Sequence, residues 1–292
     1  MFTKKILPPS LSKGYLDAFF VILIWSGFIL VSRMGGRSEL LPYDVVALRF
    51  GTAAILLAPV WLFKRRVNLL DHKMLILALT GGIGYAVLAY LGFKFAPAAH
   101  GGILLPGTLP FGTALFSWLI LKERPSAWRM SGLIAIALGI VCLAIEATDG
   151  ASSYWIGDIA FITGSAFWAV ASVLVRKWKI NAWDVTIGSA LITAILYLPV
   201  YFLWLPKNIA AAPFETIALQ AFYQGFMAVI VAMVLYMRAV ASLGPAKIGL
   251  FMALVPVLAG IAAVPLLGEP LSIYIILGLV FTSLGAWLGN RG

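Results

Sequence analysis

Long apolar runs dominate this sequence, and short segments rich in charged residues, Pro or Gly separate them. A helix that crosses the hydrocarbon core of a membrane needs about 20 mostly apolar residues. Ten runs reach that length, at roughly 14–33, 43–63, 73–93, 101–121, 127–146, 155–175, 184–205, 215–238, 246–266 and 270–289. Their continuity excludes a transmembrane β-barrel, whose strands would be alternating segments of about ten residues. The sequence therefore predicts an all-α membrane protein with ten transmembrane helices.

Composition and charge exclude several classes of function. Hydrophobic residues make up 62% of the chain and charged residues 11%, against about 25% charged in an average soluble domain. The net charge of +10 comes from short basic clusters between the apolar runs, whereas nucleic-acid binding would need a basic face. A single cysteine, Cys142, excludes a disulfide within the chain, and two scattered histidines, His72 and His100, are too few for a metal cluster. We expect a lipid bilayer as partner, and no nucleic acid, metal or cofactor.

The distribution of Lys and Arg predicts the orientation, because cytoplasmic loops of membrane proteins carry an excess of both. With a cytoplasmic N-terminus, the outer side receives only Arg33, Arg37, Lys94 and Lys207. The cytoplasmic side receives sixteen basic residues, namely Lys4, Lys5, Lys13, Lys64, Arg65, Arg66, Lys73, Lys122, Arg124, Arg129, Arg176, Lys177, Lys179, Arg238, Lys247 and Arg291. The basic N-terminal segment is expected to open the first span, since no signal-peptide cleavage site follows it. We expect both termini to be cytoplasmic.

Two stretches of equal length indicate that the chain is duplicated. The stretches "LKERPSAWRMSGLIAIALG" (121–139) and "LGEPLSIYIILGLVFTSLG" (267–285) share one Glu, two Gly and three Leu at an offset of 146. Further mates at similar offsets are Trp25 and Trp168, Asp44 and Asp184, Pro59 and Pro199, and Pro110 and Pro256. The chain is therefore predicted to contain two five-span repeats, 14–146 and 155–289.

The odd number of spans in each repeat has a geometric consequence. The second repeat must begin on the opposite face of the membrane, so a pseudo-two-fold axis in the membrane plane relates the two copies. Secondary transporters commonly use inverted repeats of this kind for alternating access. Duplication also produces inert bundles, so the repeat alone leaves a purely structural role open.

The pattern of a Pro, a Glu near a span boundary and two Gly in the next span resembles the ten-helix EamA-type members of the drug/metabolite transporter superfamily. The resemblance covers nearly the whole chain and includes "LRF" (48–50), where these proteins usually carry an Arg. Ser189 stands at the position that would match Arg49 in the second repeat, so any role of that Arg is not duplicated.

This resemblance implies an exporter of amino acids, aromatic or otherwise neutral, or of similar small metabolites in a bacterial cell inner membrane. The aromatic amino acid exporters are one branch of the superfamily that fits. The resemblance also implies a central cavity surrounded by spans one to four and six to nine, with spans five and ten packed outside it.

Two tryptophans, Trp25 and Trp168, lie well inside spans one and six, whereas the other eight lie near span ends. They would form either a stacking wall for an aromatic or amphipathic substrate or a rigid contact across the pseudo-two-fold axis. Asp158, Ser165 and Ser172 are spaced so that they share one helical face with Trp168.

Span eight carries Gln220, Tyr223 and Gln224 on one helical face, and span three carries the similar but solitary Tyr85. Lipid does not readily accept such polar stripes, so they face protein or water. Hydrogen bonds between helices and the lining of a wet cavity are both compatible with this pattern.

Three cations are candidates for contact with a substrate: Arg49 and His100 near the outer side, and Lys247 near the inner side. Each would either reach toward the membrane interface or bind a substrate carboxylate. Glu123 and Glu269 open the last span of each repeat, where an acidic residue either suits a helix N-terminus or takes part in gating.

Four prolines and several small residues bear on helix packing. Proline removes a backbone hydrogen bond and kinks a helix, so Pro59, Pro110, Pro199 and Pro256 would be either fixed kinks around a cavity or moving hinges. Small residues four apart predict close helix packing, within the bundle rather than in a dimer. They are Ala135 with Gly139, and Gly285 with Gly289.

We predict a secondary transporter that binds a small molecule near the membrane midplane and works by alternating access. A channel-like or facilitative pore, or a transporter of other metabolites or drugs, is the alternative. An enzyme would need a catalytic set such as H-E-x-x-H, which the sequence lacks along with the G-x-x-x-x-G-K-[ST] motif of ATP-driven pumps. No Asp or Glu lies at the middle of a span, which leaves proton coupling open. We expect a monomer, with a dimer as the alternative.

Overall fold

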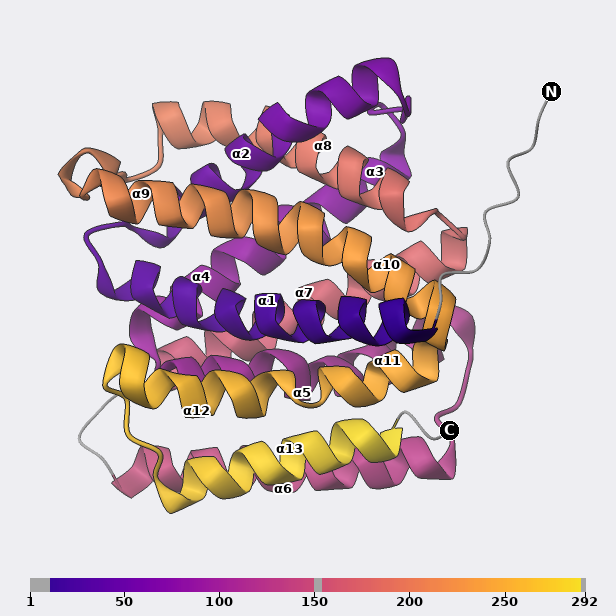
Figure 1. Ribbon diagram of the computed structural model, residues 1–292, viewed down its shortest axis with the longest axis vertical. Helices are drawn as coiled ribbons and strands as arrows, with labels where there is room; N and C mark the ends of the chain where they lie inside the picture. Colours follow the sequence, from indigo (N-terminus) through magenta and orange to yellow (C-terminus); the bar gives the residue numbers. More distant parts are fainter. Residues whose placement is uncertain (1–10, 150–153, 290–292) are drawn as a thin grey trace.

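The computed structural model describes residues 11–149 and 154–289, and every regular element in these two ranges is a helix (Figure 1). In chain order the helices are α1 (Leu11–Arg37), α2 (Pro42–Phe63), α3 (His72–Leu77), η1 (Ala78–Gly84), α4 (Tyr85–Phe95), α5 (Ala98–Phe116), η2 (Ser117–Leu121), α6 (Ala127–Asp149), α7 (Trp155–Trp178), α8 (Ala182–Leu203), η3 (Ile209–Ala211), α9 (Phe214–Gln220), η4 (Ala221–Val231), α10 (Ala232–Leu243), α11 (Pro245–Met252), α12 (Val255–Leu267) and α13 (Ile273–Gly289). Of these, η1, η2 and η4 are π-helical and η3 is a 3-10 turn.

Eight of the ten expected spans are apolar helical segments that are long enough to cross a membrane. The ninth is divided into α11 and α12, and the tenth is α13, which has 17 residues. The predicted all-α architecture is thus confirmed for the part of the chain that the structure describes. The exact count of ten crossings stays a prediction.

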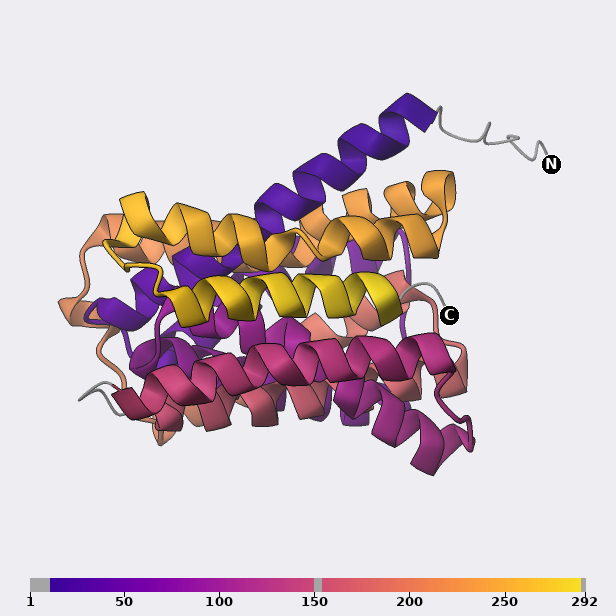
Figure 2. The same cartoon turned by 90° about the horizontal axis from the view of Figure 1, so that it is seen from below.

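Successive spans run in alternate directions, so that the start of α1 and the end of α13 lie at the same end of the bundle (Figures 1 and 2). We call this end the basic end, because it carries the loops with Lys64, Arg65, Arg66, Lys122, Arg124 and Arg176. The other end, called the opposite end, carries Arg33, Arg37, Lys94 and Lys207.

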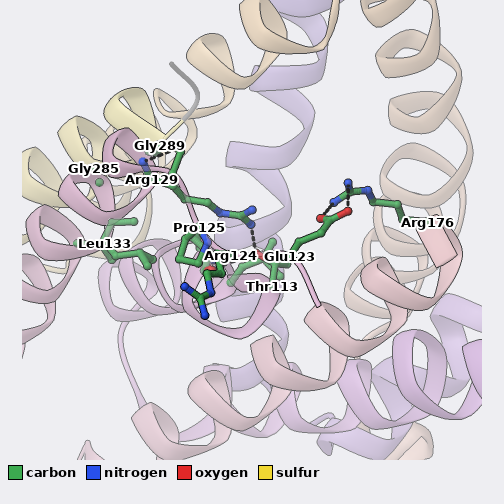
Figure 3. A pocket seen from close by; sticks show the side chains of 15 residues that line it. Thr113, Glu123, Arg124, Pro125, Arg129, Leu133, Arg176, Gly285 and Gly289 are labelled. Carbon is green, nitrogen blue, oxygen red and sulfur yellow. Dashed lines mark hydrogen bonds and ion pairs between the residues drawn. The ribbon is translucent and has the colours of Figure 1, made fainter. Parts of the chain in front are cut away.

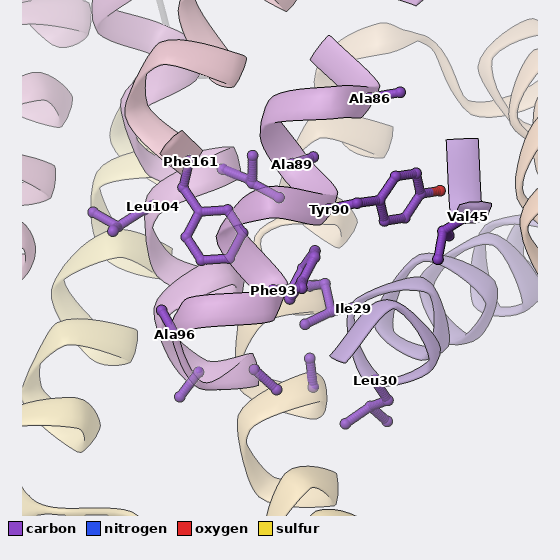
Figure 4. Close-up of a cluster of buried hydrophobic side chains, with 14 of the residues drawn as sticks. Ile29, Leu30, Val45, Ala86, Ala89, Tyr90, Phe93, Ala96, Leu104 and Phe161 are labelled. Carbon is purple, nitrogen blue, oxygen red and sulfur yellow. The ribbon is translucent and has the colours of Figure 1, made fainter. Parts of the chain in front are cut away.

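Helices from the two halves of the chain interlock. In the first half α1 packs against α10 and α12, and in the second half α7 packs against α4 and α5. Figure 4 shows the interior of this packing, where Phe93 of α4 and Phe161 of α7 meet edge-on with ring centroids 4.8 Å apart. Because lipid tails are as apolar as these side chains, close packing rather than escape from water holds the helices together.

Asp44 and Asp184 open α2 and α8, and each binds the helix of the other half. Asp44 is fully buried and accepts a hydrogen bond of 2.6 Å from the Tyr201 hydroxyl of α8. Asp184 pairs with Arg65, which follows α2. The hydrogen bond to Asp184 raises the pKa of Arg65 above its usual value. The two contacts link α2 to α8 at both ends of the bundle.

The four prolines that were expected to kink helices differ in their place within the helices. Pro59, Pro110 and Pro199 lie inside α2, α5 and α8, as expected. The ninth helix differs from the prediction, because α11 ends at Met252 and Pro256 lies in the first turn of α12. Proline suits a first helical turn, where its missing N–H costs nothing. Pro256 therefore begins a new helix, whereas its mate Pro110 lies in a continuous one.

A seam of glycines joins α6 to α13, which lie side by side along one edge of the bundle (Figures 1 and 2). A Cβ at Gly132 would lie 2.6 Å from the Gly285 carbonyl oxygen, and a Cβ at Gly285 would lie 2.5 Å from that of Gly132. About two turns further along both helices, a Cβ at Gly139 would lie 2.9 Å from the Gly278 carbonyl oxygen. These two backbones approach as closely as glycine permits, within the bundle.

We expect Gly285→Val to destabilise the protein by about 2–3 kcal/mol, because the added side chain would meet backbone atoms that have no room to move. Gly289→Ala is the matched control on the same helix, since a Cβ there meets nothing within 4 Å. Thermal unfolding of both variants in detergent checks this. Equal melting temperatures for the two variants would contradict the close contact.

Candidate substrate-binding site

Arg49 projects from α2 into the interior of the bundle. Its Nη1 donates to the Tyr90 hydroxyl at 3.2 Å and to Gln224 Oε1 at 3.4 Å. Its Nε is buried and has no hydrogen-bond partner among the described residues. No carboxylate of the described chain forms an ion pair with it either. Arg49 is therefore a positive charge that the described residues leave without a counterion.

Two buried glutamines hold the polar groups around Arg49 in place. Gln224 Oε1 accepts from the Tyr90 hydroxyl at 2.9 Å, and Gln224 Nε2 donates to Ser32 Oγ at 3.1 Å. Gln220 Nε2 donates to the Val31 carbonyl at 2.7 Å. Both glutamines are fully buried. The network fixes Gln224 Oε1, the acceptor that faces Arg49, and joins α1, α2, α4, α9 and η4.

Aromatic rings flank this network. The Arg49 guanidinium lies 5.5 Å from the centroid of Phe28 and 5.7 Å from that of Phe50. A cation is stabilised over an aromatic face without being neutralised. The charge of Arg49 is thus tolerated in the interior and stays available to an anion.

Each of the two interior tryptophans contacts a tyrosine from the other half. Trp25 of α1 lies 5.4 Å from Tyr236 of α10, and Trp168 of α7 lies 4.8 Å from Tyr85 of α4. Trp168 remains 38% exposed. Each of the predicted mates therefore has a tyrosine partner from the other half, and the contact between Trp168 and Tyr85 leaves part of the indole uncovered.

Other candidate residues make contacts between helices. Ser165 Oγ donates to the Leu105 carbonyl of α5 at 3.0 Å, and the Tyr223 hydroxyl donates to the Ile24 carbonyl of α1 at 3.1 Å. Lys247 is exposed on α11 at the basic end. The structure thus brings Arg49 together with Gln220 and Gln224, and leaves these three residues outside that network.

His100 belongs to a separate cluster near the opposite end. Its ring is fully buried, with Nδ1 2.8 Å from Asp158 Oδ1 of α7 and Nε2 3.7 Å from Glu146 Oε2 of α6. Tyr154 meets the ring edge-on. His100 therefore ties α5 to the two helices that flank it.

Sequence reasoning missed three contributors to the site, Tyr90, Phe28 and Ser32. Each is a polar or aromatic residue in an apolar span. For Tyr90 a sequence signal was available, because Tyr236 matches it at the offset of 146. The π-helices η1 and η4 were missed as well. Gln224 and Tyr223 lie within η4, and Tyr85 directly follows η1. π-Helical turns within α-helices are frequent at functional sites.

Comparison with known proteins decides the family. The model of the EamA-like transporter family matches residues 12–145 and again residues 155–291. This chain belongs to the EamA-like transporter family. It is therefore a multi-pass membrane transporter.

Individual relatives agree with this assignment. The chain is 24% identical to the Bacillus subtilis (strain 168) protein named uncharacterized transporter YyaM, over 84% of this chain and 83% of that protein. It is also 24% identical to uncharacterized transporter YdeK of the same organism, over 84% of this chain and 85% of that protein. The chain is also similar to a protein of known crystal structure, to which it is 24% identical. The match covers 95% of this chain and 96% of the chain in that structure, with a TM-score of 0.64. This similarity shows that the two chains share a fold.

Two ion pairs of this EamA-like chain join its halves at opposite ends of the bundle. Arg33 of α1 pairs with Glu269, which follows α12, at 2.6 Å, and Arg176 of α7 pairs with Glu123, which follows η2, at 2.8 Å. Arg33 and Arg176 occupy matching places after the mates Trp25 and Trp168, as the two glutamates do in the repeated stretches. We call the two pairs the opposite latch and the basic latch.

The two latches differ in burial. The side chains of the opposite latch are 14% and 12% exposed, and those of the basic latch 60% and 45%. In the opposite latch Arg33 also donates to the Phe93 carbonyl at 2.8 Å, and Glu269 accepts from the Ala98 N–H at 2.7 Å. The opposite end is therefore closed over its ion pair, whereas the basic end is open to solvent around its own.

We expect His100→Asn to lower the stability of this EamA-like protein by about 2 kcal/mol, because the largely buried carboxylate of Asp158 loses its hydrogen bond to the ring. His72→Asn is the control, since the His72 side chain is 76% exposed. Thermal unfolding in detergent measures both. A His100 variant as stable as the His72 variant would show that the cluster does not hold the three helices together.

Proposed function

We propose that this chain is a secondary transporter of a small solute with an anionic group, an amino acid carboxylate above all. Uncompensated Arg49 is the observation that carries the proposal. An interior charge without a counterion is costly, and a ligand that supplies the counterion recovers this energy on binding. The arginine fork is suited to a carboxylate, which it can bind through two parallel hydrogen bonds.

The aromatic lining favours amino acids with aromatic or other neutral side chains. Phe28 and Phe50 flank the guanidinium, and Trp168 with Tyr85 offers a partly uncovered aromatic surface. Rings of this kind stack on a planar or apolar side chain of the substrate. The polar groups of the substrate would then be free to bind Arg49 and Gln224. The substrate would then bind with its carboxylate on Arg49 and its side chain toward aromatic residues.

Alternating access between the repeats 14–146 and 155–289 is the mechanism that we propose. Its support is the pair of latches, which use mate residues at the two ends and differ in burial. A closed opposite end favours a carrier over a channel-like pore, because a pore would be open at both ends at once. The double match of the family model supports the two repeats.

The charge distribution supports an orientation of the chain in the membrane. We place the basic end in the cytoplasm, because positive residues accumulate on that side of membrane proteins. Both termini are then cytoplasmic and the structure is open inward. We propose that the solute is exported across the inner membrane. In that state the solute would enter from the cytoplasm and leave when the opposite latch opens.

Arg49→Gln is expected to weaken binding of amino acids with a free carboxylate by about tenfold or more, since a charge-assisted hydrogen bond is lost. Thermal shift with a panel of aromatic and neutral amino acids, followed by counterflow of the hits in proteoliposomes, provides the measurement. The decarboxylated amines of the same panel should bind equally poorly to both proteins. Lys177→Gln, at an exposed position of the basic end, is the control. Unchanged affinity in Arg49→Gln would refute the site.

Glu269→Gln is expected to open the opposite end, because it leaves Arg33 buried without a counterion, at a cost of about 3 kcal/mol to the closed state. Ala99→Cys in a Cys142→Ser background reports this, since Ala99 is 2% exposed and lies beside Ala98. Its labelling by a membrane-impermeant maleimide should become at least about tenfold faster. Glu123→Gln is the matched variant of the basic latch and should not accelerate the labelling. Equal rates in the two variants would contradict the gating role.

A further inference from the structure

A pocket of about 580 Å³ lies at the basic end, away from the residues that surround Arg49. The walls come from α5, α6 and α13, and its rim from the loop before α6 and the end of α7 (Figure 3). None of its lining residues belongs to the Arg49 network. The pocket is therefore a second site, at the level where the helices end.

The rim of this pocket is positively charged. It carries Arg124, Arg129 and Arg176 against one carboxylate, that of Glu123 (Figure 3). Glu123 is paired with Arg176, and Arg129 donates to Thr113 Oγ1 at 3.0 Å. Within the ranges that the structure describes, neither Arg124 nor Arg129 has a carboxylate partner. Two positive charges at the rim are thus left for a ligand.

The lining becomes apolar toward the interior of the bundle. On α6 the rim residue Arg129 is followed one and two turns deeper by Leu133 and Ile136. On α5 Thr113 is followed one turn deeper by Pro110 and Leu109. The pocket has a cationic mouth and an apolar wall, and it opens at the end of the membrane-spanning helices.

The repeat does not supply the same charges at the other end. The positions that match Arg124 and Arg129 at the offset of 146 are Pro270 and Ile275. The opposite latch, whose Glu269 matches Glu123, therefore lacks counterparts of these two arginines. The two arginines are an addition to the basic end alone.

We propose that this pocket binds the phosphate of an anionic phospholipid, with the glycerol and first acyl carbons against the apolar wall. Arg124 and Arg129 would donate charge-assisted hydrogen bonds to the phosphate oxygens. Basic pockets between helices at the cytoplasmic face suit such headgroups, because anionic lipids are available at that level. A phosphate in water would use the mouth of the pocket but not its apolar wall.

The test uses the full-length protein purified in a neutral detergent. Phosphatidylglycerol is added, and phosphatidylcholine, glycerol phosphate and inorganic phosphate are added separately. Binding raises the apparent stability by mass action, so the shift in melting temperature is read for each addition, and native mass spectrometry counts retained lipid. We expect phosphatidylglycerol alone to produce a large shift and a retained adduct.

The variant Arg124→Gln/Arg129→Gln is expected to bind phosphatidylglycerol about tenfold or more weakly, because two charge-assisted hydrogen bonds are lost. The control Lys64→Gln/Lys177→Gln removes two exposed cations from the same end outside the pocket and should behave as the unmodified protein. An equal loss in both variants would overturn the proposal in favour of diffuse attraction. An equal shift with glycerol phosphate would overturn it in favour of a soluble phosphate ligand, and no shift with phosphatidylglycerol would refute it.

Discussion

The structure depends on one constraint, that a polar group in hydrocarbon must find its partner within the protein. Helices satisfy this for the backbone. For the side chains, Gln220, Gln224, Tyr90 and Ser32 satisfy one another or a carbonyl across four helices. Arg49 meets the requirement for part of its hydrogen bonding but not for its charge. In a network that is otherwise complete, this one gap indicates where a ligand belongs.

The same constraint explains how much of the fold and of the site can be predicted from sequence. The long spans follow from apolar length alone, and the polar stripe of span eight predicts Gln220 and Gln224 as interior residues. Whether such residues bond to helices or line a cavity depends on contacts from distant spans. Ser165 illustrates this, because its acceptor, the Leu105 carbonyl, lies 60 residues away. The partners of Arg49 likewise come from three other helices, and no local pattern connects them.

Local backbone geometry was predicted less well than the spans. The π-helices and the break before Pro256 insert or remove part of a turn without changing hydropathy, so an apolar pattern does not reveal them. Pro110 and Pro256 are mates in sequence, yet only Pro256 begins a new helix. The two predicted repeats therefore differ in conformation at this pair of matching prolines. That difference is expected if the two copies occupy different states of one cycle.

For Glu123 and Glu269 the sequence left two roles open, at a helix N-terminus or in gating. Neither caps the helix that follows it, since α6 and α13 each begin four residues later, at Ala127 and Ile273. Glu269 instead accepts from the N-terminal turn of α5 and pairs with Arg33, both in the first half. Glu123 pairs with Arg176 in the second half.

One ion pair is thus built twice, at the two ends, from equivalent residues of opposite halves. Under the proposed inverted symmetry, an exchange of conformations between the halves would bury the basic latch and expose the opposite one. The two states would then contain the same kinds of contact and lie close in free energy. A solute needs only a modest difference in affinity between two such states to shift their populations. In the proposed mechanism, duplication with inversion would therefore provide the near-equality of states on which a carrier depends.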